Sequence, residues 1–134
     1  MHLDAQIADF MHGDLFAVAG ASTDRRKYGN KVLRCYQQHG HNVVPVNPNS
    51  DMVEGLAAVA SLNEVRPQPH AVSIITPSAV TKQIVEEAIC LGIQHLWLQP
   101  GAESFDAIKA CRNADINLIH SGPCILVVLG YSER

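Results

Sequence analysis

The feature that most constrains the fold is a repeated alternation of short aliphatic segments with helical patterns. Five near-continuous apolar segments of strand length lie at residues 15–20, 42–46, 70–76, 94–99 and 116–120. Such segments are typical of strands that are buried on both faces of a sheet. Strands that alternate with helices predict right-handed crossovers and a parallel sheet with helices on both sides. The sequence therefore predicts a doubly wound α/β domain.

The segments between the strands carry helical spacing and recognisable ends. Helices are predicted at residues 3–12, 30–39, 78–91 and 103–114, with one more within residues 55–65. Ser78 is the expected N-cap of its helix, and Gly40 and Gly92 are the expected helix stops. No glycine closes the helix at 103–114, so Asn113 or Asp115 is expected to adopt the left-handed turn. The apolar residues predicted to share helix faces are Ile7, Phe10, Val32, Leu33, Tyr36, Val80, Ile84, Ala88, Leu91, Phe105, Ile108 and Cys111.

Composition limits the class of protein. The chain has 134 residues, close to the commonest length of one domain, and 47% apolar residues against 17% charged residues allow a full core. A net charge of −3 argues against wrapping nucleic acid or lying on an anionic membrane through a broad basic surface. Residues 1–13 carry no secretory signal, and the longest apolar run, residues 125–129, is too short to span a bilayer. We expect one cytoplasmic domain, residues 1–134, with reduced cysteines.

The loop after the first predicted strand has the composition of an anion site. Gly20, Ala21 and Ser22 are small enough to let backbone amides approach a ligand, and the loop leads into a helix N-terminus. Residues 25–27 add three adjacent positive charges to an otherwise acidic chain. Together these residues suit a phosphorylated ligand. The alternative is that Gly20 only makes the turn and residues 25–27 form a solvated loop.

The strand ends also bear on which nucleotide is bound. Ser22 interrupts the G-x-G-x-x-G fingerprint, and the second strand ends without the acidic residue that binds a ribose diol, so NAD lacks both usual supports. That strand ends instead in a proline-bracketed turn at residues 45–49, for which a purely structural role is the alternative. Residues 76–78 and 98–101 give the next two strands compact turns. Four such turns predict one extended ligand across the carboxyl edge of the sheet.

Four sequence blocks resemble, in order and spacing, the CoA-binding domain proteins. The blocks are residues 18–22, 27–33, 40–48 and 97–101, and the resemblance runs from about residue 16 to residue 124. These small proteins are similar to the nucleotide-binding domain at the start of the succinyl-CoA synthetase alpha subunit. The resemblance implies a single-domain Rossmann-like fold, a three-layer sandwich with a mostly parallel five-stranded sheet. It also implies non-covalent binding of coenzyme A or an acyl-CoA.

The resemblance further implies which residues bind the cofactor. Different parts of CoA are assigned to different strand ends. The implied residues are Gly20, Ala21 and Ser22 at the phosphates, with charge from Arg25 or Lys27 and with Tyr28 in the same block; Asn47 and Pro48 at the adenosine end; Ile75, Thr76 and Pro77 at the adenine; and Gln99 and Gly101 along the pantetheine path.

Several positions depart from the family pattern. Ser73 and Thr76 stand where many members have an acidic residue inside the third strand and a basic residue at its end. Asn49 stands in place of a frequent lysine. The loss of two possible cations reduces the support for binding the 3′-phosphate. Residues 120–124 replace a short acidic-basic-Cys signature, and they are one residue longer and uncharged.

The sequence shows little that predicts catalysis. It contains no paired carboxylates, GxSxG elbow or GxxxxGK loop, and its seven scattered histidines lack metal-ligand spacing. His120 and Cys124 are the one candidate for a thiol and base pair. The apolar neighbours of Cys124, residues 125–128, favour an inert packing thiol. We expect a cofactor-binding module, with an NAD(P)-binding oxidoreductase, a Cys-His enzyme acting on CoA thioesters, or a structural subunit as alternatives, and a homodimer or other protein partner left open.

Overall fold

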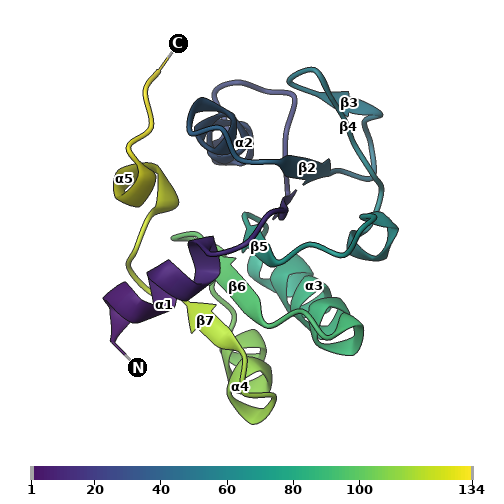
Figure 1. Cartoon of the computed structure of the whole chain (residues 1–134). Coiled ribbons are helices and arrows are strands. Elements are labelled where there is room, and N and C mark those ends of the chain that lie inside the picture. The colour runs from purple at the N-terminus through teal and green to yellow at the C-terminus, as the bar shows by residue number, and fades with distance from the viewer. Residues whose placement is uncertain (1, 134) are drawn as a thin grey trace.

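A computed structural model describes residues 2–133 of the chain, so Met1 and Arg134 of the expected domain lie outside the described residues. Figure 1 shows a central sheet with helices packed around it. The helices are α1 (Leu3–Met11), α2 (Tyr28–Gln38), α3 (Ser78–Leu91), α4 (Phe105–Asn113) and α5 (Ile125–Leu129), with a 3₁₀ turn η1 (Leu62–Glu64). The strands of the main sheet are β1 (Phe16–Ala19), β2 (Val43–Val46), β5 (Ala71–Ile74), β6 (His95–Leu98) and β7 (Asn117–Ile119). A separate two-stranded hairpin is formed by β3 (Met52–Val53) and β4 (Leu56–Ala57).

The main sheet has the strand order β2-β1-β5-β6-β7, and each neighbouring pair is parallel. This confirms the predicted α/β class and the five-stranded parallel sheet. The strand order reverses between β1 and β5, where Ala19 is in register with Ile74. The loops that leave these two strands therefore start side by side. Such a switch point is where ligands bind in open α/β sheets.

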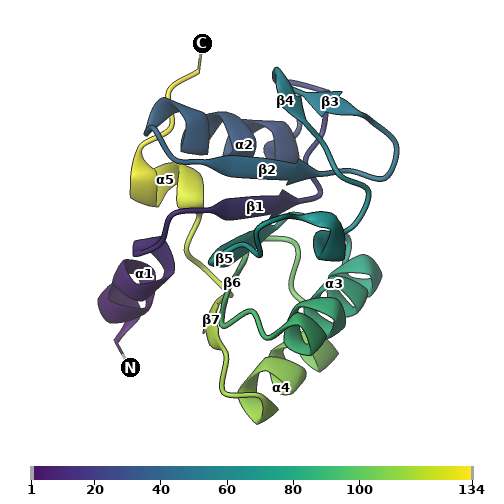
Figure 2. The same ribbon diagram turned by 45° about the vertical axis from the view of Figure 1, so that its right-hand side comes forward.

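Helices cover both faces of the sheet, as Figure 2 shows. On one face, Phe16 and Val18 of β1 pack with residues of α1, α2 and α5. On the other face, Ala17 and Ala19 pack with residues of α3 and α4. Alternate residues of one strand thus contribute to two separate cores, as expected for a sheet that is buried on both sides. Among residues 2–133, no helix is long and apolar enough to cross a membrane.

The prediction of a helix within residues 55–65 is wrong. That segment contains β4, an isolated bridge between Val59 and Val46, and η1. The N–H of Val59 donates to the carbonyl of Pro45, and its carbonyl accepts from the N–H of Asn47. These bonds satisfy backbone groups at the outer edge of β2, which a helix at this position would leave unpaired.

Most of the residues predicted to end the helices do so in the structure. Gly40 and Gly92 adopt left-handed conformations at the ends of their helices, and Asp115 takes the left-handed turn after α4 with a φ of 54°. Ser78 is not the N-cap of α3. Pro77 occupies that position, with a φ of −58° and a ψ of 151°, and Ser78 is the first helical residue.

Two of the apolar side chains that were predicted to face the core are exposed instead. Phe105 is 81% exposed and Val80 is 41% exposed. The buried face of α4 is formed by Ala107 and Cys111, which lie on the opposite side of the helix from Phe105. In α3 the buried residues are Thr81, Val85 and Ala88, so the core-facing stripe is rotated from the predicted one, and Val80 lines a cavity instead.

Candidate functional site

The loop after β1 is packed against its neighbours at backbone distance. Gly20 has a φ of 92°, and a Cβ atom there would lie 2.0 Å from the carbonyl oxygen of Ile75. Gly29, in the first turn of α2, would place a Cβ atom 2.0 Å from the carbonyl oxygen of Gly20. The end of β1, the end of β5 and the start of α2 therefore meet at positions that only glycine can occupy.

Two asparagines fix the carbonyl groups of this loop. Asn47 Nδ2 donates to the carbonyl of Ala21 at 2.8 Å, and Asn30 Nδ2 donates to the carbonyl of Ser22 at 2.8 Å. Asn47 Oδ1 also accepts from the N–H of Asn49 at 2.7 Å. Within residues 2–133, the N–H groups of Ala21 and Ser22 have no hydrogen-bond acceptor. The loop can therefore offer these donors to an anion.

Most of the predicted basic triplet is paired with carboxylates. Arg26 binds both oxygens of Asp24 at 3.1 Å, and these hydrogen bonds lower the pKa of the Asp24 carboxyl to about 2. Arg25 lies 3.6 Å from Glu54 of the β3–β4 hairpin. Lys27 is exposed at the N-cap of α2. The local positive charge is thus smaller than the sequence alone indicates.

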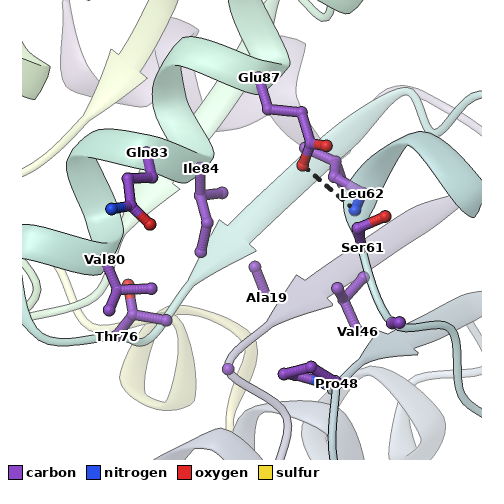
Figure 3. A pocket seen from close by; sticks show the side chains of 12 residues that line it. Ala19, Val46, Pro48, Ser61, Leu62, Thr76, Val80, Gln83, Ile84 and Glu87 are labelled. Carbon is purple, nitrogen blue, oxygen red and sulfur yellow. Dashed lines mark hydrogen bonds between the residues drawn. The ribbon is translucent and has the colours of Figure 1, made fainter.

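A cavity of about 370 Å³ lies at the carboxyl edge, between the ends of β1 and β2 and the outer face of α3. Figure 3 shows Val80 and Ile84 of α3 on one side of this cavity and Val46 and Pro48 on the other. Gly20 and Thr76, which lie at the switch point, also line it. Its volume falls within the range of small-molecule sites, and its largely apolar walls suit a flat ring.

A second, smaller cavity of about 250 Å³ lies beside the starts of α2 and α5. It is lined by Tyr28, Gln99, Pro100 and Cys124. Tyr28 and Gln99 were predicted as ligand residues, and Gly20, Pro48 and Thr76 of the larger cavity were predicted too. The structure therefore divides the predicted residues between two hollows of the same sheet edge.

Other predicted residues lie outside these two hollows. Asn47 is turned onto the loop, and Ile75 packs partly into the core. Pro77 is exposed at the start of α3, and Gly101 is exposed, with its N–H bound to the Glu103 carboxylate at 2.9 Å. Nothing in the structure tests their contact with a ligand, so their roles stay predictions.

Comparison with known proteins identifies the family. The sequence matches the CoA binding domain over residues 14–130. The chain belongs to the CoA-binding domain family.

Relatives of this CoA-binding domain include stand-alone proteins and one subunit of a larger enzyme. The uncharacterized protein YneT of Bacillus subtilis is 29% identical over 96 residues, which are 72% of this chain and 71% of YneT. A conserved hypothetical protein of Pyrococcus furiosus, of known structure, is 35% identical, with a TM-score of 0.81 over 87% of this chain and 99% of its own. The alpha subunit of the ADP-forming acetate–CoA ligase II of P. furiosus is 33% identical over 72 residues, which are 53% of this chain but 16% of that subunit.

Several residues of the larger cavity were not predicted from the sequence of this CoA-binding domain. Ala60, Ser61 and Leu62 were missed because they fall in the segment that was expected to be a helix. Gln83 and Glu87 also line the cavity. They share one helical stripe with Val80 and Ile84, and polar residues at positions 83 and 87 of that stripe were the available signal.

Ser73 and Thr76, which depart from the family pattern, each form a hydrogen bond with another hydroxyl group. The Ser73 hydroxyl lies 2.7 Å from that of Tyr36 in the core, where burial raises the pKa of the Tyr36 phenol. The Thr76 hydroxyl lies 2.7 Å from that of Thr81 at the start of α3. Ser73 thus satisfies a buried phenol, and Thr76 connects the switch point to α3.

Gln99 connects the sheet edge to α5. Its Nε2 donates to Cys124 Sγ at 2.9 Å, and its Oε1 accepts from the N–H of Ile125 at 3.2 Å. His120 Nδ1 lies 2.6 Å from the Ser121 hydroxyl. The hydrogen bonds of the described residues thus pair Cys124 with Gln99 and His120 with Ser121.

Two further thiols, Cys35 and Cys111, are buried. Burial raises the pKa values of Cys35 and Cys111 to about 11, which keeps both thiols protonated at neutral pH. Among residues 2–133, no three His, Cys, Asp or Glu side chains are grouped so that they could hold a metal ion.

Proposed function

We propose that this protein binds coenzyme A, or a CoA thioester, non-covalently across the carboxyl edge of the sheet. The observation that carries the proposal is the pair of cavities at this edge. Gly20, at the start of the loop after β1, lines one cavity, and Tyr28, at the start of α2 where that loop ends, lines the other. CoA is an elongated ligand with a nucleotide at one end and a pantetheine arm at the other. Membership of the CoA-binding domain family supports the same assignment.

The larger cavity suits the adenosine end. Its opposing apolar walls can enclose a purine ring, with Thr76 and Pro48 at the rim nearest the loop. Gln83 and Glu87 give one side of the cavity hydrogen-bonding groups, although one Glu87 oxygen already accepts from the N–H of Leu62 at 3.2 Å. Polar groups at the edge of an apolar pocket fix the orientation of a ligand.

The phosphates suit the loop between the two cavities. The start of this loop at Gly20 packs against Gly29 in the first turn of α2 and against Thr76, two residues before α3, and neither helix has an acidic residue in its first turn. Both helix dipoles therefore favour an anion at this edge. The pantetheine arm would then pass Tyr28 and Gln99 toward Cys124.

We expect calorimetry at moderate salt to show tighter binding of CoA than of NAD or NADP. We base this expectation on the fit of an extended phosphorylated ligand to the sheet edge and on the missing acidic residue after Val46. Because phosphate recognition is largely electrostatic, the affinity should fall as salt rises. Dephospho-CoA, matched to CoA except for the 3′-phosphate, is the control that reports on that group alone. Equal or stronger binding of NAD(H) would refute the proposal.

We also propose that the protein is a cofactor-binding or regulatory module and not an enzyme. The hydrogen bonds of Cys124 and His120 to different partners support this view. We expect alkylation of Cys124 at neutral pH to be no faster than that of a free-thiol standard, with Cys124→Ser to assign the signal. If Cys124 reacts many times faster and His120→Ala slows it, the Cys-His enzyme becomes the better hypothesis.

A further inference from the structure

Arg34 is a buried cation on α2, and it is not among the residues that line the two proposed ligand cavities. Its side chain is 6% exposed. Arg34 Nε donates to Asn30 Oδ1 at 2.7 Å, and Nη2 donates to the carbonyl of Arg25 at 2.9 Å. A buried guanidinium is stable only where such partners surround it. Both partners involve the loop that we assign to phosphate binding. Arg25 belongs to that loop, and Asn30 donates to the carbonyl of Ser22 within it.

The bond from Arg34 also determines which way the Asn30 amide points. A guanidinium can only donate, so the Asn30 oxygen must face Arg34 and the nitrogen must face away. In that orientation Asn30 Nδ2 donates to the carbonyl of Ser22 at 2.8 Å and to Glu54 at 2.9 Å. Arg34 therefore holds the loop at two points, directly at Arg25 and through Asn30 at Ser22.

A segment far away in sequence packs on the same guanidinium. Residues 130–133 follow α5 and lie along α2, where Gln38 exchanges two hydrogen bonds with the backbone of Ser132, at 2.6 and 3.0 Å. The Glu133 carboxylate lies 3.6 Å from Arg34 Nη2 and 3.8 Å from Lys31 Nζ. The Tyr131 ring lies under the guanidinium at 5.4 Å. The segment thus supplies both a counter-charge and an aromatic face.

We infer that Arg34 is a positioning residue for the phosphate-binding loop, and that Glu133, by pairing with it, couples the docking of residues 130–133 on α2 to the affinity for the ligand. The inference rests on the proposed function for its ligand but not for the contact itself. Coupling of this kind is reciprocal, so ligand binding should also hold residues 130–133 more firmly on α2.

The test compares Glu133→Gln with wild-type protein in two measurements. The first is amide hydrogen exchange of Asp24 and Arg26 without ligand, because both N–H groups bond within the loop and report its opening. The second is CoA affinity by calorimetry. We expect faster exchange at both amides and a loss of affinity of about fivefold or more, the lower end of typical coupling. Glu86→Gln, which removes one exposed carboxylate on α3, should change neither.

A second variant separates positioning from charge. Arg34→Lys keeps the positive charge but cannot present a planar fork to Asn30 and Arg25 together. We expect it to behave like Glu133→Gln, whereas full rescue by lysine would show that charge alone matters and would overturn the inference. Unchanged exchange of Asp24 and Arg26 in Glu133→Gln would also overturn it. Faster exchange with unchanged CoA affinity would disprove the coupling to ligand. If wild-type protein fails to bind CoA, the proposed function fails, and exchange still decides whether Glu133 acts on the loop.

Discussion

Replacing Ser22 by aspartate is expected to remove most of the affinity for coenzyme A while leaving Tm nearly unchanged. Ser22 lies in the loop that offers unbonded N–H groups, and its hydroxyl accepts from the N–H of Asp24 at 3.0 Å. An aspartate can accept the same bond, so the turn is retained. Its carboxylate would face the phosphates, and two like charges about 4 Å apart at a partly exposed site repel by roughly 4 kcal/mol. We therefore expect an affinity loss of about a hundredfold or more.

The matched control is Ser22→Asn, which has nearly the same shape as Ser22→Asp without the charge. Calorimetry should show that Ser22→Asn keeps most of the affinity, and thermal unfolding should show both variants near the wild-type Tm. A similar loss in both variants would indicate steric exclusion. Unchanged affinity in Ser22→Asp would place the phosphates elsewhere on the sheet edge.

The fold was predictable because a parallel sheet leaves a strong signature in the sequence. Each strand of the main sheet is buried on both faces, so each appears as an aliphatic run between turn residues. The order of the strands and the meeting of Gly20 with Ile75 were not predicted, because the handedness of a crossover determines on which face its helix lies but not which strand is the neighbour. The segment at residues 55–65 was misassigned because what decides its structure is pairing with β2 through Val59, a contact that no local pattern records.

The site was predictable only where it depends on single turns. Small residues at 20–22 and the proline-bracketed turn at residues 45–49 identified the carboxyl edge, and Gly20, Pro48 and Thr76 do line one cavity. Charge was less predictable. Glu54, on a hairpin that the sequence did not reveal, pairs with Arg25, and such pairing depends on tertiary structure. The roles of Arg34 and Glu133 were hidden for the same reason.

Gly29→Ala is expected to lower the free energy of unfolding by about 3 kcal/mol, at the upper end of the cost of overpacking. In an ordinary helix this change would stabilise by about 1 kcal/mol, because alanine is the better helix former. Here the new Cβ atom would lie 2.0 Å from the backbone carbonyl oxygen of Gly20. Gly20 has little room to retreat, since a Cβ atom built on it would itself lie 2.0 Å from the Ile75 carbonyl oxygen, so the backbone there is already closely packed. The clash therefore outweighs the gain in helix propensity.

Thermal and denaturant unfolding measure this effect, and the expected change corresponds to a Tm decrease of roughly 10 °C for a domain of this size. Glu86→Ala, at an exposed position of α3, is the control and should change stability little. CoA affinity, measured well below the lowered Tm, should fall as well, because relief of the clash moves the loop away from α2. Wild-type stability in Gly29→Ala would show that α2 and the loop can separate without cost, and close backbone packing would then not be what fixes the loop. Loss of stability without loss of affinity would instead show that the packing of Gly29 does not affect the phosphate site. Ser22→Asp would then be the measurement that locates the ligand.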